Sequence, residues 1–204
     1  MASDDLISGR AEAITDFLQR RRSVVARNQQ TDPIPEGDLN IILSCGIRVP
    51  DHGALAPWRI VVIDKQAGAW LGEEILAPAF QAEHSDATEA MLTAERNRFL
   101  RGGVVLAVLS TPQESKKIPL WEMELSAGAV CTNLVVAATA LGYGAQWLTE
   151  WPAYNKAVLS ALGGAENTDK IAGFIYVGQR QTVPEERRRP DPQTVISRLT
   201  VPNP

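Results

Sequence analysis

The chain has 204 residues, of which 45% are hydrophobic and 22% are charged. This length suits one ordinary domain with a substantial core, and it excludes a mini-protein held together by disulfides. Lys and Arg number 20 and Asp and Glu number 24, so the formal net charge is −4. An acidic chain has no general attraction to nucleic acid or to an anionic membrane, so an anionic ligand must be bound locally.

The two cysteines, Cys45 and Cys131, lie in apolar stretches and lack the spacing of metal ligands. This pattern favours reduced, structural thiols and predicts no metal site. The first residues are polar and acidic and do not resemble a secretory signal. We therefore expect a cytoplasmic protein without a membrane or nucleic-acid partner.

Apolar residues at helical spacing predict a first helix over residues 5–21, which ends in three arginines at 20–22. A second helix is predicted from Pro35 and Glu36 to about Gly46. Residues 58–63 are apolar, β-branched and bounded by proline and aspartate, which indicates a strand.

The polar stretch 66–101 predicts two solvent-facing helices that are divided near Ala77 and Pro78. Short β-branched segments predict three further strands. These segments are residues 104–109, 145–148 and 171–177. Helices and strands mixed in this way place the chain in the α/β or α+β class.

Residues 121–141 predict the most apolar helix of the chain, with Gly142 at its C-terminal end. Its uninterrupted apolar part is shorter than the roughly 20 residues that a membrane span needs, so we expect a buried helix. Because it is apolar nearly all round and rich in small residues, it must be covered on every side. A monomer could cover it, but the packing of two copies would do so more easily, which favours a homodimer.

Two arginine triplets stand out in this acidic chain, at residues 20–22 and 187–189. Arg21, Arg22 and Ser23 at a helix end form the kind of cradle that binds an oxyanion such as a phosphate monoester. An alternative is that the first triplet complements the helix dipole and the second belongs to a solvated tail. In that tail, residues 195–199 hold apolar side chains spaced like an arm that docks on another surface.

Familiar catalytic patterns are absent from the sequence. There is no Gly-x-Ser-x-Gly motif, and Gly142-Tyr-Gly144 follows a helix and therefore does not fit a dinucleotide fingerprint. A Cys–His pair that includes His52 stays open as a minor alternative. We predict no catalytic side chain, and we expect a bound organic cofactor to supply the reactivity.

Several segments, taken in order, resemble the FMN-dependent nitroreductase family, most closely its small YdjA-like subgroup. The likeness runs from about residue 14 to residue 178. It is carried by Arg21-Arg22-Ser23, Arg48-Val-Pro-Asp-His52, Ala-Pro-Trp at 56–58, Lys117-Ile-Pro-Leu-Trp-Glu, the helix 121–142 and the Gly-Tyr-Gly-Ala-Gln-Trp turn.

The resemblance implies an α+β fold in which helices wrap a central, mostly antiparallel sheet. It further implies an interlocked homodimer with exchanged C-terminal arms, and residues 1–204 as a single FMN-binding domain. NADH or NADPH would deliver hydride to N5 of the flavin, and a nitroaromatic, quinone or similar small molecule would then take the electrons. An alternative from another class is a flavin-binding carrier or sensor without turnover.

The resemblance also assigns residues to the cofactor. The phosphate and ribityl chain would be held by Arg21, Arg22 and Ser23, with Arg187 and Arg189 as further phosphate ligands from the tail. Arg48 and His52 would approach the flavin, His52 from the same or the other subunit, and Trp147, Leu148 and Thr149 would line the ring. Three positions depart from the family pattern: Ala54 and Ala56 replace polar residues near the ring, and Leu148 replaces a basic one.

Overall fold

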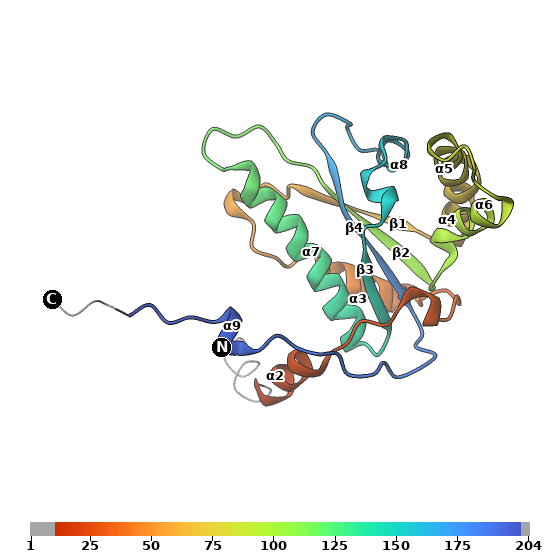
Figure 1. Cartoon of the computed structure of the whole chain (residues 1–204). Coiled ribbons are helices and arrows are strands. Elements are labelled where there is room, and N and C mark those ends of the chain that lie inside the picture. Colours follow the sequence, from red (N-terminus) through yellow and green to blue (C-terminus); the bar gives the residue numbers. More distant parts are fainter. Residues whose placement is uncertain (1–10, 201–204) are drawn as a thin grey trace.

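The computed structural model describes residues 11–200, which form a four-stranded antiparallel sheet with helices on both faces (Figure 1). This arrangement confirms the predicted α+β class, and the predicted strands agree with the observed ones to within one residue. In order across the sheet they are β1 (Trp58–Ile63), β2 (Val104–Ser110), β4 (Lys170–Gly178) and β3 (Gly144–Leu148). Because β3 lies at an edge, its outer side is open to other segments.

One face of the sheet is covered by α3 (Glu36–Gly46) and α7 (Leu120–Ala140). Alternate residues of β2 point to this face, and the others point to the opposite face, so every residue of β2 is buried. The absence of a side chain at Gly46 lets α3 approach α7, since a Cβ there would lie 2.3 Å from Leu134 Cδ2. Both helices have the bounds that the sequence predicts, to within a residue.

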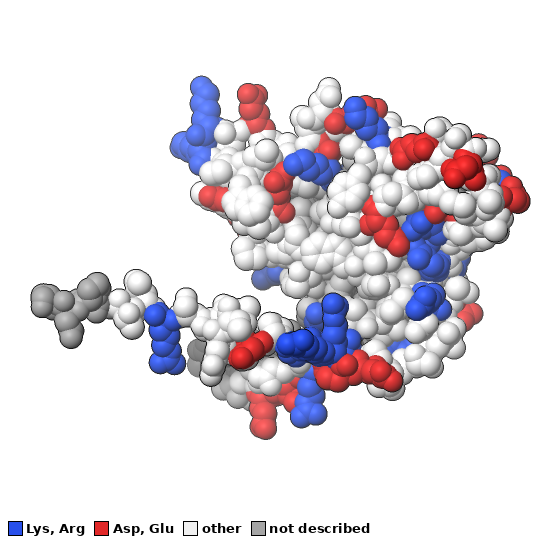
Figure 2. All heavy atoms as spheres, in the orientation of Figure 1, with Lys and Arg blue, Asp and Glu red and all other residues white. Residues whose placement is uncertain are grey.

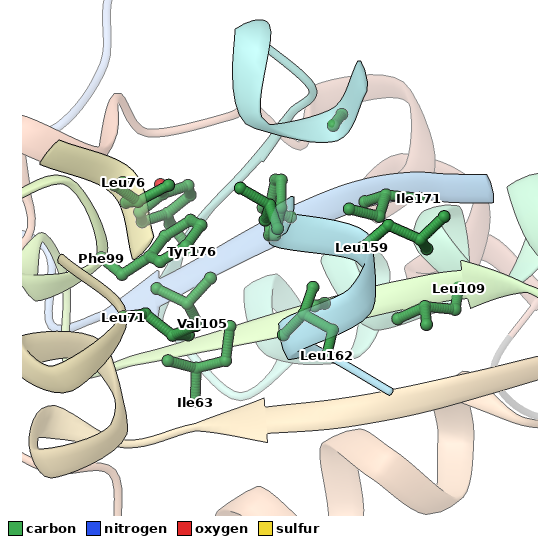
Figure 3. Close-up of a cluster of buried hydrophobic side chains, with 14 of the residues drawn as sticks. Ile63, Leu71, Leu76, Phe99, Val105, Leu109, Leu159, Leu162, Ile171 and Tyr176 are labelled. Atoms are coloured by element: carbon green, nitrogen blue, oxygen red, sulfur yellow. The ribbon is translucent and has the colours of Figure 1, made fainter. Parts of the chain in front are cut away.

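The opposite face is covered by a series of short helices and by an apolar cluster (Figure 3). Aromatic rings form much of this cluster, and the ring centroids of Phe99 and Phe174 lie 4.8 Å apart. The helices are α4 (Lys65–Leu71), the π-helical turn η3 (Gly72–Leu76), α5 (Ala77–Glu83), α6 (Glu89–Arg96), η4 (Arg98–Leu100), η5 (Trp151–Tyr154) and α8 (Lys156–Ala161).

The expected division of residues 66–101 near Ala77 and Pro78 is wrong. The helical segments α4, η3 and α5 follow one another without a gap, and the chain turns at residues 84–88 instead. The Ala77 N–H bonds to the Gly72 carbonyl in the π-helical turn, and Pro78 follows at the second position of α5. A proline there is tolerated because the first turn of a helix needs few backbone donors.

Two segments extend away from the body of the molecule (Figure 1). The first, α2 (Ala11–Arg20), has no buried residue, and the part of the predicted first helix before residue 11 lies outside the described residues. The second is the C-terminal segment, which passes α2 and contains α9 (Pro192–Val195). Leu199 is 98% exposed in this segment, so the predicted arm does not dock on its own chain.

Among residues 11–200, α7 alone is long and apolar enough to cross a membrane by length and composition. Half of its most apolar window is buried inside the chain, where it packs on α3 and the sheet. The core helix of a globular domain meets the same criterion. Its outer side stays open, with Trp121 at 66% and Leu125 at 53% exposure.

Candidate functional site

A cavity of about 590 Å³ lies where α2 ends beside the C-terminal segment. Figure 2 shows basic and acidic side chains gathered near this place. Four of the lining residues are arginines: Arg20, Arg21, Arg22 and Arg180. So many guanidinium groups around one cavity favour an anionic ligand.

Arg21 has an unmet hydrogen-bonding requirement. Its Nη1 atom is buried, and within the described part of the chain no acceptor reaches it. A buried donor without a partner costs about 1–3 kcal/mol, and native structures rarely keep one without a reason. A ligand phosphate in the cavity would satisfy this nitrogen, so the residues present fit a phosphate-bearing cofactor.

Arg22 is held by the C-terminal segment. Its Nη1 atom donates to the Glu185 carbonyl and lies 3.5 Å from Glu186 Oε1. The pKa of Glu186 lies below its usual value, because the Arg187 backbone N–H bonds to its carboxylate and because Arg189 and Arg22 lie nearby. These contacts favour the charged form of Glu186, which lies where Arg22 would bind a phosphate.

The arginines are fixed against the edge of the sheet by the segment that follows α2. The Val24 N–H donates to the Ala145 carbonyl at 3.0 Å, and the Ala26 N–H donates to Gln146 Oε1 at 2.6 Å. This pairing is extended through η1 (Ala26–Asn28). It places the arginines of the cavity near the start of β3, and Ser23 is exposed beside them without lining the cavity.

Trp147 and Leu148 lie at the other end of β3 and Thr149 directly follows it, about 10 to 16 Å from the start of the strand. Trp147 is 40% exposed and donates from Nε1 to the Ala172 carbonyl at 3.1 Å. Its ring lies directly over Gly173, where a Cβ would come within 2.0 Å of Nε1. Leu148 packs instead into the cluster of Figure 3, so only its backbone faces the side of Trp147.

A second cavity, of about 290 Å³, is lined by His52 and by the first turns of α7. His52 Nδ1 lies 2.6 Å from Glu122 Oε2. Ser126 fixes the loop before it, because its hydroxyl donates to the Pro50 carbonyl and accepts from Trp58 Nε1. His52 begins the turn η2 (His52–Ala54). Its contact with Glu122 orients its ring against α7.

The loop after His52 contains two alanines with left-handed backbone conformations. Ala54 has a φ of 52° and Ala56 a φ of 46°, which few residues other than glycine or asparagine adopt readily. The Ala56 N–H donates to Asp51 Oδ2 at 2.7 Å and stabilises this path of the chain. Ala54 and Ala56 are two of the three positions at which the sequence departs from the pattern of the resemblance, the third being Leu148.

The two cavities lie at opposite ends of α7. Thr139 lines the arginine cavity and Ser126 lines the histidine cavity, so about 20 Å of helix separates them. One chain therefore does not bring Arg21 and His52 around one cavity. Arg48 is exposed between them, and its carbonyl accepts from Asn133 of α7 at 2.7 Å.

Arg187 and Arg189 lie outside the arginine cavity in this chain. Together with Arg188 they line a separate cavity of about 440 Å³, and Arg189 pairs with Glu186 at 3.1 Å. Arg180 takes a place beside Arg21 that the sequence did not predict. A backbone bridge between Gln29 and Arg180 brings it there, and such a bridge has no signal in the sequence.

Other reactive groups lie apart from these cavities. Burial raises the pKa of the Cys131 thiol to about 12, whereas Cys45 is exposed. Over residues 11–200, no three His, Cys, Asp or Glu side chains are grouped so that they could hold a metal ion.

The geometry defines an α+β protein with an arginine-lined cavity at one edge of its sheet. Residues 18–179 match the model described as "Nitroreductase family". The chain therefore belongs to the nitroreductase family of oxidoreductases, as the sequence resemblance predicts.

Relatives support the predicted subgroup. The Escherichia coli (strain K12) protein named "Putative NAD(P)H nitroreductase YdjA" is 33% identical over 171 residues, covering 81% of this chain and 87% of the relative. A Haemophilus influenzae protein named "Putative NAD(P)H nitroreductase" is 30% identical over 170 residues, covering 82% of this chain and 88% of the relative.

Solved structures show the same fold. The Bacillus cereus nitroreductase-like family protein has a TM-score of 0.73 at 20% identity, with 91% of this chain and 95% of that chain covered. A Bacteroides fragilis nitroreductase with bound FMN has a TM-score of 0.66 at 21% identity, with coverage of 92% and 98%.

Proposed function

We propose that this chain is an FMN-dependent NAD(P)H oxidoreductase that acts as a cytoplasmic homodimer, with residues 1–204 as one FMN-binding domain. The observation that carries the proposal is the buried Arg21 Nη1, which has no partner within residues 11–200, in an arginine-lined cavity at the sheet edge. The FMN named in the Bacteroides fragilis relative is a phosphate monoester and suits that cavity.

The phosphate end of FMN would be bound by Arg21, Arg22 and Ser23. Arg22 can exchange its contact with Glu186 for a phosphate, since an ion pair 3.5 Å long with a 66% exposed carboxylate contributes little. Arg187 and Arg189 lie on the segment that carries Glu186, so a shift of this segment could bring them to the same phosphate.

The ring end would lie along the outer part of β3, against Trp147 and the backbone of Leu148 and Thr149. When bound, FMN supplies the redox chemistry, accepting hydride from NADH or NADPH and passing electrons to a nitroaromatic, quinone or similar acceptor. Arg48 and Arg22 would provide the positive charge that favours electron-rich states nearby. No side chain of the chain itself is required as a nucleophile.

The arrangement of α7 supports the proposed dimer. Its outer side exposes Leu120, Trp121 and Leu125, and an exposed apolar surface of this kind marks an interaction site. An antiparallel two-fold pairing along α7 would bring the His52 end of one chain to the Arg21 end of the other. Each site would then draw on both chains, and the exposed tail would reach its partner.

The test is the visible spectrum of the FMN-supplemented protein before and after anaerobic addition of NADH or NADPH. We expect bound-flavin bands that bleach within seconds and return when a nitroaromatic or quinone is added. A bound flavin that stays yellow would favour a carrier or sensor, and a protein that retains no flavin would overturn the proposal. Light scattering on the same sample should give the mass of a dimer.

A further inference from the structure

Glu150 has a backbone conformation that is otherwise nearly restricted to glycine. It directly follows Thr149 and has φ 51° and ψ −174°. A side chain in this region costs of order 1–3 kcal/mol and persists only where the surroundings hold it. Some other contact must therefore favour this conformation.

Two arginines hold the Glu150 side chain. Oε2 of Glu150 accepts a hydrogen bond from Arg98 Nη1 and another from Arg101 Nη2, the latter at 3.2 Å. Arg98 is only 14% exposed and is itself fixed by the buried Glu95, to which its Nε atom donates at 2.6 Å. Glu150 is thus tied to the rigid turn η4, about 50 residues earlier in the chain.

A second contact fixes the residue after Glu150. Trp151 Nε1 donates to Glu95 Oε2 at 3.0 Å, so the same buried carboxylate braces both Arg98 and Trp151. Arg101 lies 4.9 Å above the Tyr176 ring and donates to its hydroxyl, which connects the cluster to β4. The turn after β3 is therefore anchored at both Glu150 and Trp151.

We propose that Glu150, held by Arg98 and Arg101, is a positioning residue that keeps the Trp147–Thr149 backbone in the conformation that binds FMN. This inference rests on the proposed function, since that function places the ring against these residues. The two ion pairs hold the side chain of this strained residue, while its carbonyl accepts only a long local hydrogen bond from the Ala153 N–H, at 3.3 Å. Without the two ion pairs, residue 150 would relax to an ordinary φ, and Thr149 would turn away from the place proposed for the flavin ring.

Three variants of the full chain test this role. In Glu150→Ala the ion pairs are lost while a Cβ still disfavours the native backbone conformation. In Glu150→Gly the ion pairs are also lost, but glycine adopts that conformation without strain. Glu89→Ala is the matched control, because it removes a carboxylate paired with Arg96 on the same side of the molecule.

We expect Glu150→Ala to weaken FMN binding about tenfold in a titration, and Glu150→Gly to stay within about threefold of wild type. Hydrogen exchange of the FMN-free protein should be faster over residues 148–152 in Glu150→Ala than in wild type or Glu89→Ala. Faster exchange there would show a role of the ion pairs that does not depend on bound cofactor.

Wild-type FMN affinity in Glu150→Ala, unchanged exchange, or equal weakening in the alanine and glycine variants would each overturn the positioning role. These results would leave the proposed function intact. If the wild-type protein did not bind FMN, the proposed function would fail and the positioning role with it, whatever the exchange data showed.

Discussion

Two arginine clusters in this molecule differ in how far their hydrogen bonds are satisfied. Around η4, Arg98 and Arg101 meet the carboxylates of Glu95 and Glu150. Around the end of α2, Arg21 keeps a buried nitrogen without a partner among the described residues. The first cluster is complete within the chain and is structural, whereas the second needs an anion from outside.

The electrostatics of Arg98 support this distinction. Burial alone would lower the pKa of Arg98, but the hydrogen bonds and charges of Glu95 and Glu150 outweigh burial and raise it. A buried pair of this kind contributes to stability only while both partners are present. Removing a partner at η4 should therefore lower folding stability, with FMN affinity affected only through the positioning role of Glu150, whereas removing an arginine at α2 should affect cofactor binding directly.

The largest expected effect is on folding stability, when Arg98 is replaced. Arg98→Ala should lower the free energy of unfolding by about 3–5 kcal/mol, because Glu95 would remain buried with an uncompensated charge. Denaturant unfolding measures this. Arg96→Ala is the control, since Arg96 makes only surface pairs and should cost less than about 1 kcal/mol. Equal midpoints for the two variants would contradict the structural role of Arg98.

Arg22→Ala should weaken FMN binding and leave folding stability nearly unchanged. We expect it to purify largely colourless, with FMN affinity lowered roughly 10- to 100-fold by the loss of charged hydrogen bonds. Its unfolding midpoint should stay near that of wild type, because both of its partners, the Glu185 carbonyl and Glu186, belong to exposed residues of the C-terminal segment. Arg27→Ala, which changes the net charge equally but lies outside the cavity, is the control. Full FMN occupancy in Arg22→Ala would show that its assignment is wrong.

Alkaline pH should weaken the packing of Tyr176 against the η4 cluster. Burial raises the pKa of Tyr176 to about 12, partly opposed by Arg101, whereas an unfolded tyrosine has a pKa near 10. The neutral hydroxyl therefore adds stability below pH 10, and this is lost as the pH rises to about 12, by about 2–3 kcal/mol. Between pH 9 and pH 11.5 the free energy of unfolding should fall less in Tyr176→Phe than in wild type, which denaturant unfolding at the two pH values measures. An equal fall in both proteins would contradict this role of Tyr176.

The smallest expected effect concerns the loop beside His52. Ala56→Gly should raise the free energy of unfolding by up to about 1 kcal/mol, because glycine adopts a φ of 46° without strain. Ala79→Gly in α5 is the control and should instead destabilise the protein by about 1 kcal/mol. Thermal unfolding separates the two, and a loss of stability in Ala56→Gly would show that the loop conformation carries no strain.

Local patterns in the sequence predicted most of the fold. The strand at 58–63 is bounded by Pro57 and Asp64, and α3 and α7 follow from apolar spacing between clear end signals. The break assigned to Pro78 was wrong because a π-helical turn precedes it. A local pattern does not distinguish a proline that ends a helix from one that enters its first turn.

The site was less predictable, because its contacts join distant segments. The arginine cradle at 21–22 was visible as a motif, but Arg180 reaches the cavity through a bridge to Gln29. Likewise, the contact between His52 and Glu122 spans 70 residues. Such pairings depend on the packing of the whole chain, and no spacing in the sequence encodes them.

The most direct test of the cradle compares FMN with riboflavin, which lacks the phosphate, in titrations of wild type and Arg21→Ala. We expect wild type to bind FMN at least about 100-fold more tightly than riboflavin, and this preference to fall below about tenfold in Arg21→Ala. The variant should fold as well as wild type, since it removes an unsatisfied buried donor. Equal affinities of wild type for the two flavins, or an unchanged preference in the variant, would contradict the account.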